Sequence, residues 1–256
     1  MSSISNISQA PIDQSAGAPG TGGIPRLLLV LTAVTIITVA FGVYLALGYA
    51  EQDLEQGNVQ RIFYLHMPSF FGAMLAFGGT VIGGIMYLRT RTVKWDILSV
   101  AGVEVGLALA LINLVTGAIW ARPIWNTWWT WDPRLTADAI MILTYMAYLM
   151  LRNGIENPDT RRRFSAVYGI LAFTTVLVTL FIIRVIPTTI HPAVIGPSPQ
   201  NAEGTFEATG NVAAALVPNL IIWGALVPVV LMWWRIRLEN MFEAVHRMKI
   251  ELLSED

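Results

Sequence analysis

The sequence predicts an all-α integral membrane protein built as a bundle of six transmembrane helices. Hydrophobic residues make up 55% of the 256 residues and charged residues only 13%, a balance typical of chains that fold in lipid. The apolar residues also form long continuous runs, and about 20 such residues in a helix cross about 30 Å of hydrocarbon. These runs favour helices over the short alternating strands of an outer-membrane barrel.

Six runs are long enough to cross a membrane. From the N-terminus onward they are Leu27–Tyr49, Phe70–Leu88, Ile97–Trp120, Leu135–Leu151, Tyr168–Ile186 and Val212–Trp234. The first run is longer than the apolar core of a signal peptide, and residues 1–25 contain no Lys or Arg. We therefore expect it to be an uncleaved anchor.

The ends of the chain differ from this membrane domain, which we assign to residues 27–238. Residues 1–26 are rich in Ser, Gly, Pro and Ala, a composition that predicts a disordered cytoplasmic lead. The tail at residues 239–256 carries apolar residues at helical spacing, namely Met241, Phe242, Val245, Met248 and Leu252. This spacing predicts an amphipathic cytoplasmic helix that lies along the inner surface or packs on a partner.

Basic residues place both chain ends in the cytoplasm. Twelve of the sixteen Lys and Arg residues lie before the first span, after the second, after the fourth and at or beyond the end of the sixth. The other four lie at the opposite ends of the spans: Arg61, Arg122, Arg134 and Arg184. Because cytoplasmic loops carry the excess of Lys and Arg, the loop between the third and fourth spans faces outside.

A few polar residues interrupt the spans. Glu104 and Asn113 lie in the third span, and Asp138 lies near the start of the fourth. A carboxylate in hydrocarbon is costly, so Glu104 is a candidate functional residue, with a protonated or hydrogen-bonded helix contact as the alternative. Asp132 and Pro133 suit the N-cap and first position of the fourth helix, so that pair has a structural interpretation as well.

The chain contains no cysteine. This absence excludes disulfides, thiolate metal sites, thiol catalysis and covalent haem attachment through a C-x-x-C-H motif. No phosphate-binding loop is present either, so an ATP-driven step would require a partner chain. We expect no catalytic residue and no nucleic-acid partner.

The densest group of aromatic residues lies between the third and fourth spans. Residues 120–136 contain five of the nine tryptophans, at Trp120, Trp125, Trp128, Trp129 and Trp131. One interpretation is an aromatic belt at the membrane interface. A belt requires neither this density nor the acid, proline and base that follow at Asp132, Pro133 and Arg134. We therefore favour a surface for a large planar ligand.

Two of the three histidines fall in the same outer layer as this segment. His66 precedes the second span and His191 follows the fifth, whereas His246 lies in the tail. Such a histidine is often only a hydrogen-bonded structural residue. Two imidazoles beside an aromatic wall also match the axial ligands of a haem iron. The haem propionates would then pair with a cation of the outer layer: Arg122, Arg134 or Arg184.

A membrane cytochrome of a quinone-linked electron-transfer complex is the alternative function. Such proteins also use two histidine ligands, but they usually place them within the spans. In this sequence no histidine lies inside an apolar run, so haem handling at the outer surface is favoured.

The run Trp128–Thr136 resembles the tryptophan-rich "WWD" signature of the haem-handling proteins of cytochrome c biogenesis. Its Arg-Leu-Thr ending is similar to that of the haem exporter protein C family. The blocks Arg61–Pro68 and Thr116–Trp120 fit the same family, as do six spans. Alanine at 121 and asparagine at 126 stand where glycine is expected, and the Trp pair and second histidine that many members have after His191 are missing. The alternative within the family is the larger haem-ligase branch, which usually carries more spans and a large extracytoplasmic domain, for which we expect no room in this chain.

The resemblance implies non-covalently held haem b at the outer face of the cytoplasmic membrane, passed to a periplasmic haem chaperone for cytochrome c maturation. It also implies work beside ATP-binding cassette exporter subunits and a small single-span subunit, among membrane lipids. The iron ligands would be His66 and His191. The full set of haem-binding residues would be His66, His191, Trp120, Trp125, Trp128, Trp129, Trp131, Asp132 and Arg134.

Overall fold

The computed structural model describes residues 23–193, 196–204 and 210–254. In this part of the chain every element of regular secondary structure is a helix, apart from one isolated β-bridge between Asp53 and Gly57. The elements in order are α1 (Arg26–Tyr44), the π-helix η1 (Leu45–Tyr49), the 3₁₀-helix η2 (Asn58–Ile62), α2 (Phe63–Thr90), α3 (Val93–Trp125), α4 (Pro133–Gly154), α5 (Pro158–Val185), α6 (Gly210–Ile221), the π-helix η3 (Ile222–Leu226) and α7 (Val227–Ser254).

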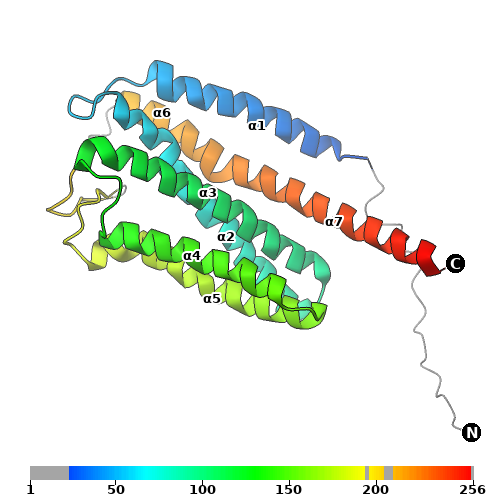
Figure 1. Cartoon of the computed structure of the whole chain (residues 1–256). Helices are drawn as coiled ribbons and strands as arrows, with labels where there is room; N and C mark the ends of the chain where they lie inside the picture. The colour runs from blue at the N-terminus through cyan, green and yellow to red at the C-terminus, as the bar shows by residue number, and fades with distance from the viewer. Residues whose placement is uncertain (1–22, 194–195, 205–209, 255–256) are drawn as a thin grey trace, which may run out of the picture.

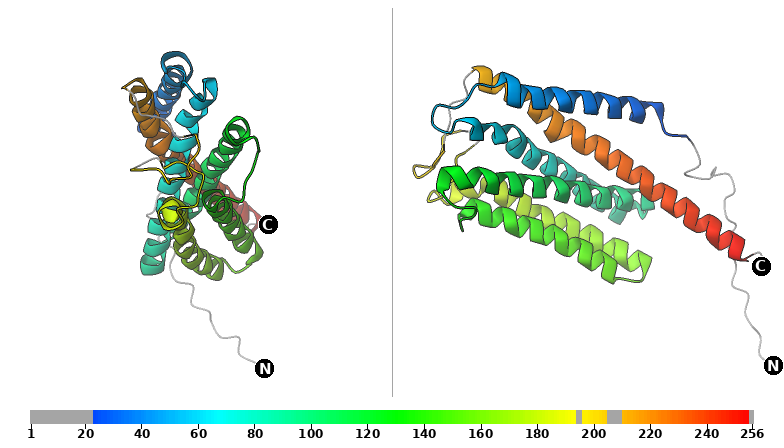
Figure 2. Two further views of the ribbon diagram at one scale, coloured as in Figure 1. Left: turned by 90° about the vertical axis from the view of Figure 1, so that its left-hand side faces the viewer. Right: turned by 45° about the horizontal axis from the view of Figure 1, so that its top comes forward.

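The helices form an up-and-down bundle with α2 and α3 at its centre (Figure 1). Helices α4 and α5 pack on one side of this central pair, and α1 packs with α6, η3 and α7 on the other (Figures 1 and 2). The long connections at 50–62, 126–132 and 186–204 meet at one end of the bundle. The tight turns after α2 and α4 lie at the opposite end.

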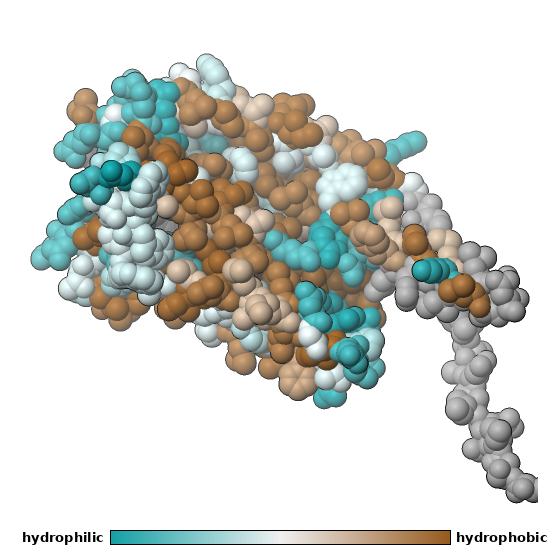
Figure 3. All heavy atoms as spheres, viewed as in Figure 1, coloured by the Kyte–Doolittle hydropathy of each residue, from teal (hydrophilic) through white to brown (hydrophobic). Residues whose placement is uncertain are grey.

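The chain is a multi-pass membrane protein. In the described residues, six helical spans are long and apolar enough to cross a membrane, and α6, η3 and α7 together provide the sixth. Apolar side chains cover the middle of the molecule, and polar residues gather towards its two ends (Figure 3). The prediction of an all-α six-span fold is confirmed.

Small residues let α2 and α3 approach each other closely. A Cβ atom at Gly102 of α3 would lie 2.4 Å from the carbonyl oxygen of Ala76, and one at Gly106 would lie 2.6 Å from the ring of Phe77. Membrane helices associate through such contacts because lipid supplies no hydrophobic force between them. The close approach also presses the end of α2 that carries His66 against α3.

Helix α5 begins at Pro158, ten residues before the predicted run, and two other helices extend beyond their predicted runs at the end of the bundle that carries the long connections. Helix α2 begins at Phe63, seven residues before the expected span, so His66 lies in its first turn and not in a loop. Helix α3 continues to Trp125, so Trp120 and Trp125 are helical and the connecting segment begins only at Asn126. These turns lie at the polar end of the bundle, where backbone hydrogen bonding continues although hydropathy falls.

Asn126 ends α3 in the left-handed conformation, with φ of 53°. Glycine is the usual residue at such a helix terminus, and asparagine is the common substitute. The asparagine that stands in place of an expected glycine therefore fulfils the same backbone requirement. Its side chain also accepts a hydrogen bond from Arg122.

The predicted tail is a direct continuation of the last span. Helix α7 runs without a break from Val227 to Ser254 and extends beyond the other helices (Figure 1). The boundary at residue 239 is therefore not marked by a change in secondary structure, and the tail's position on a membrane surface remains a prediction. The predicted disordered lead falls almost entirely on residues 1–22, outside the described residues.

Charged side chains between helices are paired. Glu104 of α3 receives two hydrogen bonds from Arg235 of α7, which also contacts Glu239. The helix-contact interpretation of Glu104 therefore has a structural basis. Nearer the turn after α4, the buried Asp96 carboxylate receives two hydrogen bonds of 2.8 and 2.7 Å from Arg152.

Candidate functional site

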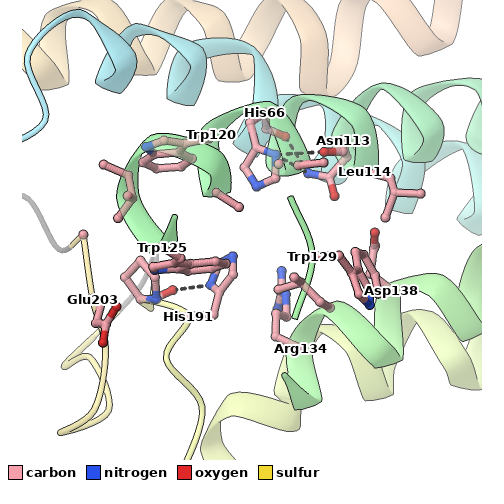
Figure 4. A pocket seen from close by; sticks show the side chains of 17 residues that line it. His66, Asn113, Leu114, Trp120, Trp125, Trp129, Arg134, Asp138, His191 and Glu203 are labelled. Carbon is pink, nitrogen blue, oxygen red and sulfur yellow. Dashed lines mark hydrogen bonds between the residues drawn. The ribbon is translucent and has the colours of Figure 1, made fainter. Parts of the chain in front are cut away.

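A cleft opens at the end of the bundle where the long connections meet. About 680 Å³ of space, its open mouth included, lies between the lining atoms. Its walls come from α2, α3, α4 and the connections at 126–132 and 186–204. Figure 4 shows His66 and His191 facing this space from opposite walls.

His66 is held between two helices. Its Nδ1 atom lies 3.0 Å from the backbone carbonyl oxygen of Asn113, on α3. A carbonyl can only accept, so Nδ1 carries the proton and Nε2 keeps its lone pair. The Asn113 side chain donates to the His66 carbonyl at 2.8 Å, and a Cβ atom at Gly117 would lie 2.9 Å from the His66 ring. The imidazole is thus fixed in both tautomer and position.

His191 has the same tautomer on a different scaffold. Its Nδ1 donates to the carbonyl oxygen of Pro192 at 2.7 Å, which leaves Nε2 as the lone-pair atom. Burial lowers the pKa of His191 to about 3, helped by the Arg134 guanidinium and by His66, while the Pro192 carbonyl opposes the shift. His191 is therefore neutral at physiological pH, the form in which an imidazole binds a metal.

Each histidine has a tryptophan partner on α3. The ring of Trp120 meets the ring of His66 edge-on, with centroids 5.7 Å apart. Trp125 meets His191 in the same manner at 6.2 Å. Trp129 lines the cleft from the connection at 126–132. Three of the five predicted tryptophans therefore lie at the cleft, beside the two imidazoles.

The remaining two tryptophans point away from it. The Trp128 side chain is 59% exposed and that of Trp131 is 81% exposed, and neither lines the cleft. The rings of Trp131 and Trp129 meet edge-to-face, with their centroids 5.9 Å apart. The presence of a tryptophan within residues 120–136 therefore does not decide whether its indole faces the cleft.

The indole N–H groups of the cleft also differ. Trp120 Nε1 donates to the side-chain oxygen of Gln56 at 2.9 Å, so its orientation is set by the connection before η2. Trp125 Nε1 is buried and has no hydrogen-bond partner among the described residues. A buried donor without an acceptor is costly, and at a cleft wall it is a candidate contact for an oxygen of the ligand.

Asp132 caps α4, as the sequence suggests. Its carboxylate accepts from the backbone N–H of Arg134 at 2.8 Å, and Pro133 occupies the first helical position. The same carboxylate also receives hydrogen bonds from Thr189 and from the N–H of Ile190. The residue therefore belongs to the wall behind the cleft, on which the His191 segment rests.

Of the three arginines predicted to meet an anionic ligand, Arg134 is the one that lines the cleft. It lies over the ring of Phe70, 4.8 Å from the centroid, and donates to the carbonyl oxygen of Thr179 at 2.5 Å. Asp138, one turn along α4, also lines the cleft and has a buried oxygen without a donor in the described structure. A cation and a carboxylate thus share the α4 wall.

Several residues of this wall escape prediction from sequence. Gln56 and Thr189 each hold a residue of the site in place, yet neither belongs to a pattern that carries chemistry. Asn113 stands out in the sequence as a polar residue within a span, but the histidine that it contacts is 47 positions away. Only the packing of α2 on α3 reveals that pairing.

The chemistry of this arrangement suits a metal that already has other ligands. No cluster of three or more His, Cys, Asp or Glu side chains able to hold a bare metal ion occurs in the described structure. Two neutral imidazoles instead offer two nitrogen donors, tryptophan rings offer flat apolar cover, and Arg134 offers a cation. Haem can use all three features: the iron binds the imidazole nitrogens, the porphyrin ring packs against the tryptophans, and a propionate pairs with the cation.

The sequence matches the family described as "Heme exporter protein C" over residues 22–242. This chain belongs to that family. It is 32% identical to the "Heme exporter protein C" of Haemophilus influenzae over 145 residues, 57% of this chain and 58% of that protein. Its identity to the Rhodobacter capsulatus protein of the same name is 34% over 135 residues, 53% of this chain and 56% of the relative.

A plant relative connects the family with cytochrome c. The "Putative cytochrome c biosynthesis ccmC-like mitochondrial protein" of Arabidopsis thaliana is 35% identical over 120 residues, 47% of either chain. The chain thus spans little more than half the length of the bacterial relatives and about half that of the plant protein. The resemblance seen in the tryptophan segment and around His66 is confirmed at the level of family.

Proposed function

We propose that this protein binds haem b without a covalent bond in the cleft between His66 and His191. The decisive observation is that the Nδ1 atoms of both histidines are committed to backbone carbonyls, which leaves both Nε2 lone pairs for iron. This is the arrangement by which proteins orient metal-binding imidazoles. The names of the relatives support haem as the ligand.

The other cleft residues hold the porphyrin and its acidic groups in this proposal. Trp120, Trp125 and Trp129 cover the apolar faces and edges of the ring, where aromatic area stabilises binding. Arg134 pairs with a propionate, assisted by the free indole N–H of Trp125. The absence of cysteine leaves no thiol for covalent attachment, so haem can leave again.

The proposal places the cleft at the outer face of the cytoplasmic membrane, with both chain ends in the cytoplasm. The support is the position of twelve of the sixteen basic residues at or beyond the opposite end of the bundle. Reporter fusions after Glu55, Asn126 and Gln200 are expected to report outside, and fusions after Arg91 and Pro158 inside. An inside signal at Asn126 would contradict the proposed orientation.

From this cleft, haem passes to a periplasmic haem chaperone during cytochrome c maturation. The exposed Trp128 and Trp131 support such a contact, since they present apolar surface next to the cleft. In this proposal the protein works beside ATP-binding cassette exporter subunits and a small single-span subunit, and it performs no net chemistry of its own. The cytochrome c connection of the plant relative supports this place in the pathway.

Haem spectra with and without chaperone test the function. Full-length protein in detergent, loaded with haem, should show the spectrum of iron with two imidazole ligands. Addition of the haem-free chaperone should transfer haem from this protein to the chaperone. A spectrum that persists unchanged in excess chaperone, while quinol reduces the iron, would instead identify the membrane cytochrome that the sequence left as the alternative.

A further inference from the structure

His191 sits on a connection that is tied to the helical bundle through Asp132. The Asp132 side chain is 7% exposed and Thr189 is 0% exposed. The Thr189 hydroxyl lies 2.8 Å from each carboxylate oxygen of Asp132, and the N–H of Ile190 donates to Oδ2 at 2.8 Å. These hydrogen bonds link residues that are 57 and 58 positions apart in the chain.

The link continues to the histidine itself. The backbone N–H of His191 donates to the Thr189 hydroxyl oxygen at 3.1 Å. The Thr189 hydroxyl thus donates a hydrogen bond to Asp132 and accepts one from the backbone N–H of His191. Consecutive residues 189, 190 and 191 are therefore each connected to the carboxylate, either directly or through the hydroxyl. Since the imidazole is then fixed by Pro192, the position of its Nε2 atom follows from that of Asp132.

The other hydrogen bonds near His191 do not fulfil this role. The N–H of Glu203 donates to the carbonyl of Ile190 at 2.9 Å, and the N–H of Ala193 donates to Ser198. Both bonds join one part of the 186–204 connection to another. The Gln56 side chain holds Gly204, thirteen residues beyond His191. Asp132, at the start of α4, provides the attachment next to the histidine.

Capping of α4 does not account for this arrangement. An N-cap requires one acceptor for the N–H of Arg134, and Ser caps a helix about as well as Asp. A buried carboxylate with three donors is needed only if it also holds the second segment, because hydrogen bonds to an ionised acceptor are about twice as strong as neutral ones. The two roles of Asp132 are thus separable by mutation.

We propose that Asp132 and Thr189 are positioning residues that set the place of the His191 imidazole in the cleft. The inference rests on the proposed function, because it takes His191 as a haem ligand. Residues that orient metal-binding histidines typically change metal affinity by about ten- to a hundredfold when they are replaced. Loss of the Asp132–Thr189 link should therefore free His191 while His66 stays in place.

Thr189→Val and Thr189→Ser are the matched test. Valine keeps the shape of threonine and removes the hydroxyl, whereas serine keeps the hydroxyl. In haem-loaded, full-length protein, Thr189→Val should weaken haem retention about ten- to a hundredfold and convert the iron spectrum from two nitrogen ligands to one. Added imidazole should restore the two-ligand spectrum, and Thr189→Ser should remain close to wild type.

Asp132→Ser separates the cap from the link. Serine still accepts the N–H of Arg134, but its side chain is too short to reach Thr189 and Ile190 as well. We expect normal protein levels in the membrane, together with the same spectral change as in Thr189→Val. A wild-type spectrum in both Asp132→Ser and Thr189→Val would overturn the inference.

Combination with His191→Ala shows whether the effect acts through this histidine. If it does, Thr189→Val should cause no further loss in the His191→Ala background, because coupled residues are not additive. An equal loss in both backgrounds would overturn the positioning role and leave the proposed function intact. Wild-type haem retention in His191→Ala itself would overturn the ligand assignment, and with it both proposals.

Discussion

The two cleft histidines, His66 and His191, both leave their Nε2 atom free, but they are held in place by different parts of the fold. On the α2 side, His66 lies in a helix, donates to a carbonyl of the neighbouring helix at 3.0 Å, and has Gly117 directly behind its ring. On the opposite side, His191 lies in a connection without regular structure and is held through Asp132 and Thr189. One imidazole is part of helix packing, and the other depends on a few hydrogen bonds.

In the proposed function, this difference would let one site both hold and release haem. Connections open at a lower free-energy cost than packed helices, and the parts of proteins that move come from such regions. In the proposed haem complex, opening of residues 186–193 would remove one iron ligand, while His66 keeps the other. Release would then proceed from the His191 side, next to the exposed Trp128 and Trp131.

Removal of either imidazole should give the largest effect. We expect His66→Ala and His191→Ala each to lower haem retention by more than about a hundredfold, above the range for residues that only orient a ligand. Both variants should still insert in the membrane, because neither histidine lies in the central part of a span. His246→Ala, on the tail, serves as the control. Unchanged haem spectra in both cleft variants would contradict the ligand assignment.

Gly117→Ala tests the helix side of the comparison alone. The added Cβ would lie 2.9 Å from Cε1 of His66, so the ring must shift. We expect haem retention to fall by about ten- to a hundredfold, as for other residues that orient a ligand. Gly78→Ala is the matched control, because it also lies in a membrane helix and its Cβ would meet nothing within 4 Å. Equal haem retention in the two variants would show that His66 is not confined.

Acid should destabilise the closed form of the His191 segment. In the closed cleft the pKa of His191 is about 3, whereas an imidazole in water titrates near 6.5. Between these values the opened connection binds a proton that the closed one does not, so each pH unit below 6.5 destabilises the closed form by up to about 1.4 kcal/mol.

Hydrogen exchange can measure this loss in the haem-free protein. After correction for intrinsic rates, exchange of the Ile190 amide should accelerate by up to about tenfold per pH unit below pH 6.5. The amide of Val103, which is buried in α3 about three turns before Asn113, should show no such dependence. His191→Gln supplies the second control, because it removes the titrating group. A pH response in that variant equal to the wild type would refute the assignment to His191.

Tryptophan replacements should have smaller, graded effects. Trp120→Phe loses the hydrogen bond to Gln56, which is worth about 1 kcal/mol or about fivefold in haem retention. Trp129→Phe keeps most of the aromatic area and should be milder than Trp129→Ala. Trp128→Ala and Trp131→Ala should leave haem retention unchanged and slow transfer to the chaperone. Haem loss from those two variants would contradict the assignment of these indoles to the chaperone contact.

Sequence patterns predict the spans better than the ends of the helices. Hydropathy locates all six spans, because lipid imposes the same requirement along each of them. It places the start of the second span at Phe70, seven residues late, because the polar end of α2 is held by backbone hydrogen bonds and by contact with α3. The error matters, since it assigns His66 to a loop although it belongs to a helix.

For the candidate site too, some features follow from the sequence and others only from the tertiary structure. The sequence by itself determined the residue types, namely two histidines, a dense tryptophan segment and an arginine at one end of the bundle, because topology alternates the loops between two sides. Only the tertiary structure decided that Trp120, Trp125 and Trp129 line the cleft while Trp128 and Trp131 face outward. Those directions depend on where α3 ends, at Asn126, and on how the next segment turns.

The tertiary structure likewise decided the role of Asp132. The pattern of acid followed by proline determined a helix cap, since capping needs only local geometry. The contact with Thr189 could not be derived from the sequence, because it joins residues 57 positions apart through the fold of the 186–204 connection. Local physics therefore specified which residues are present and which helices they begin or end, and long-range packing specified what each side chain touches.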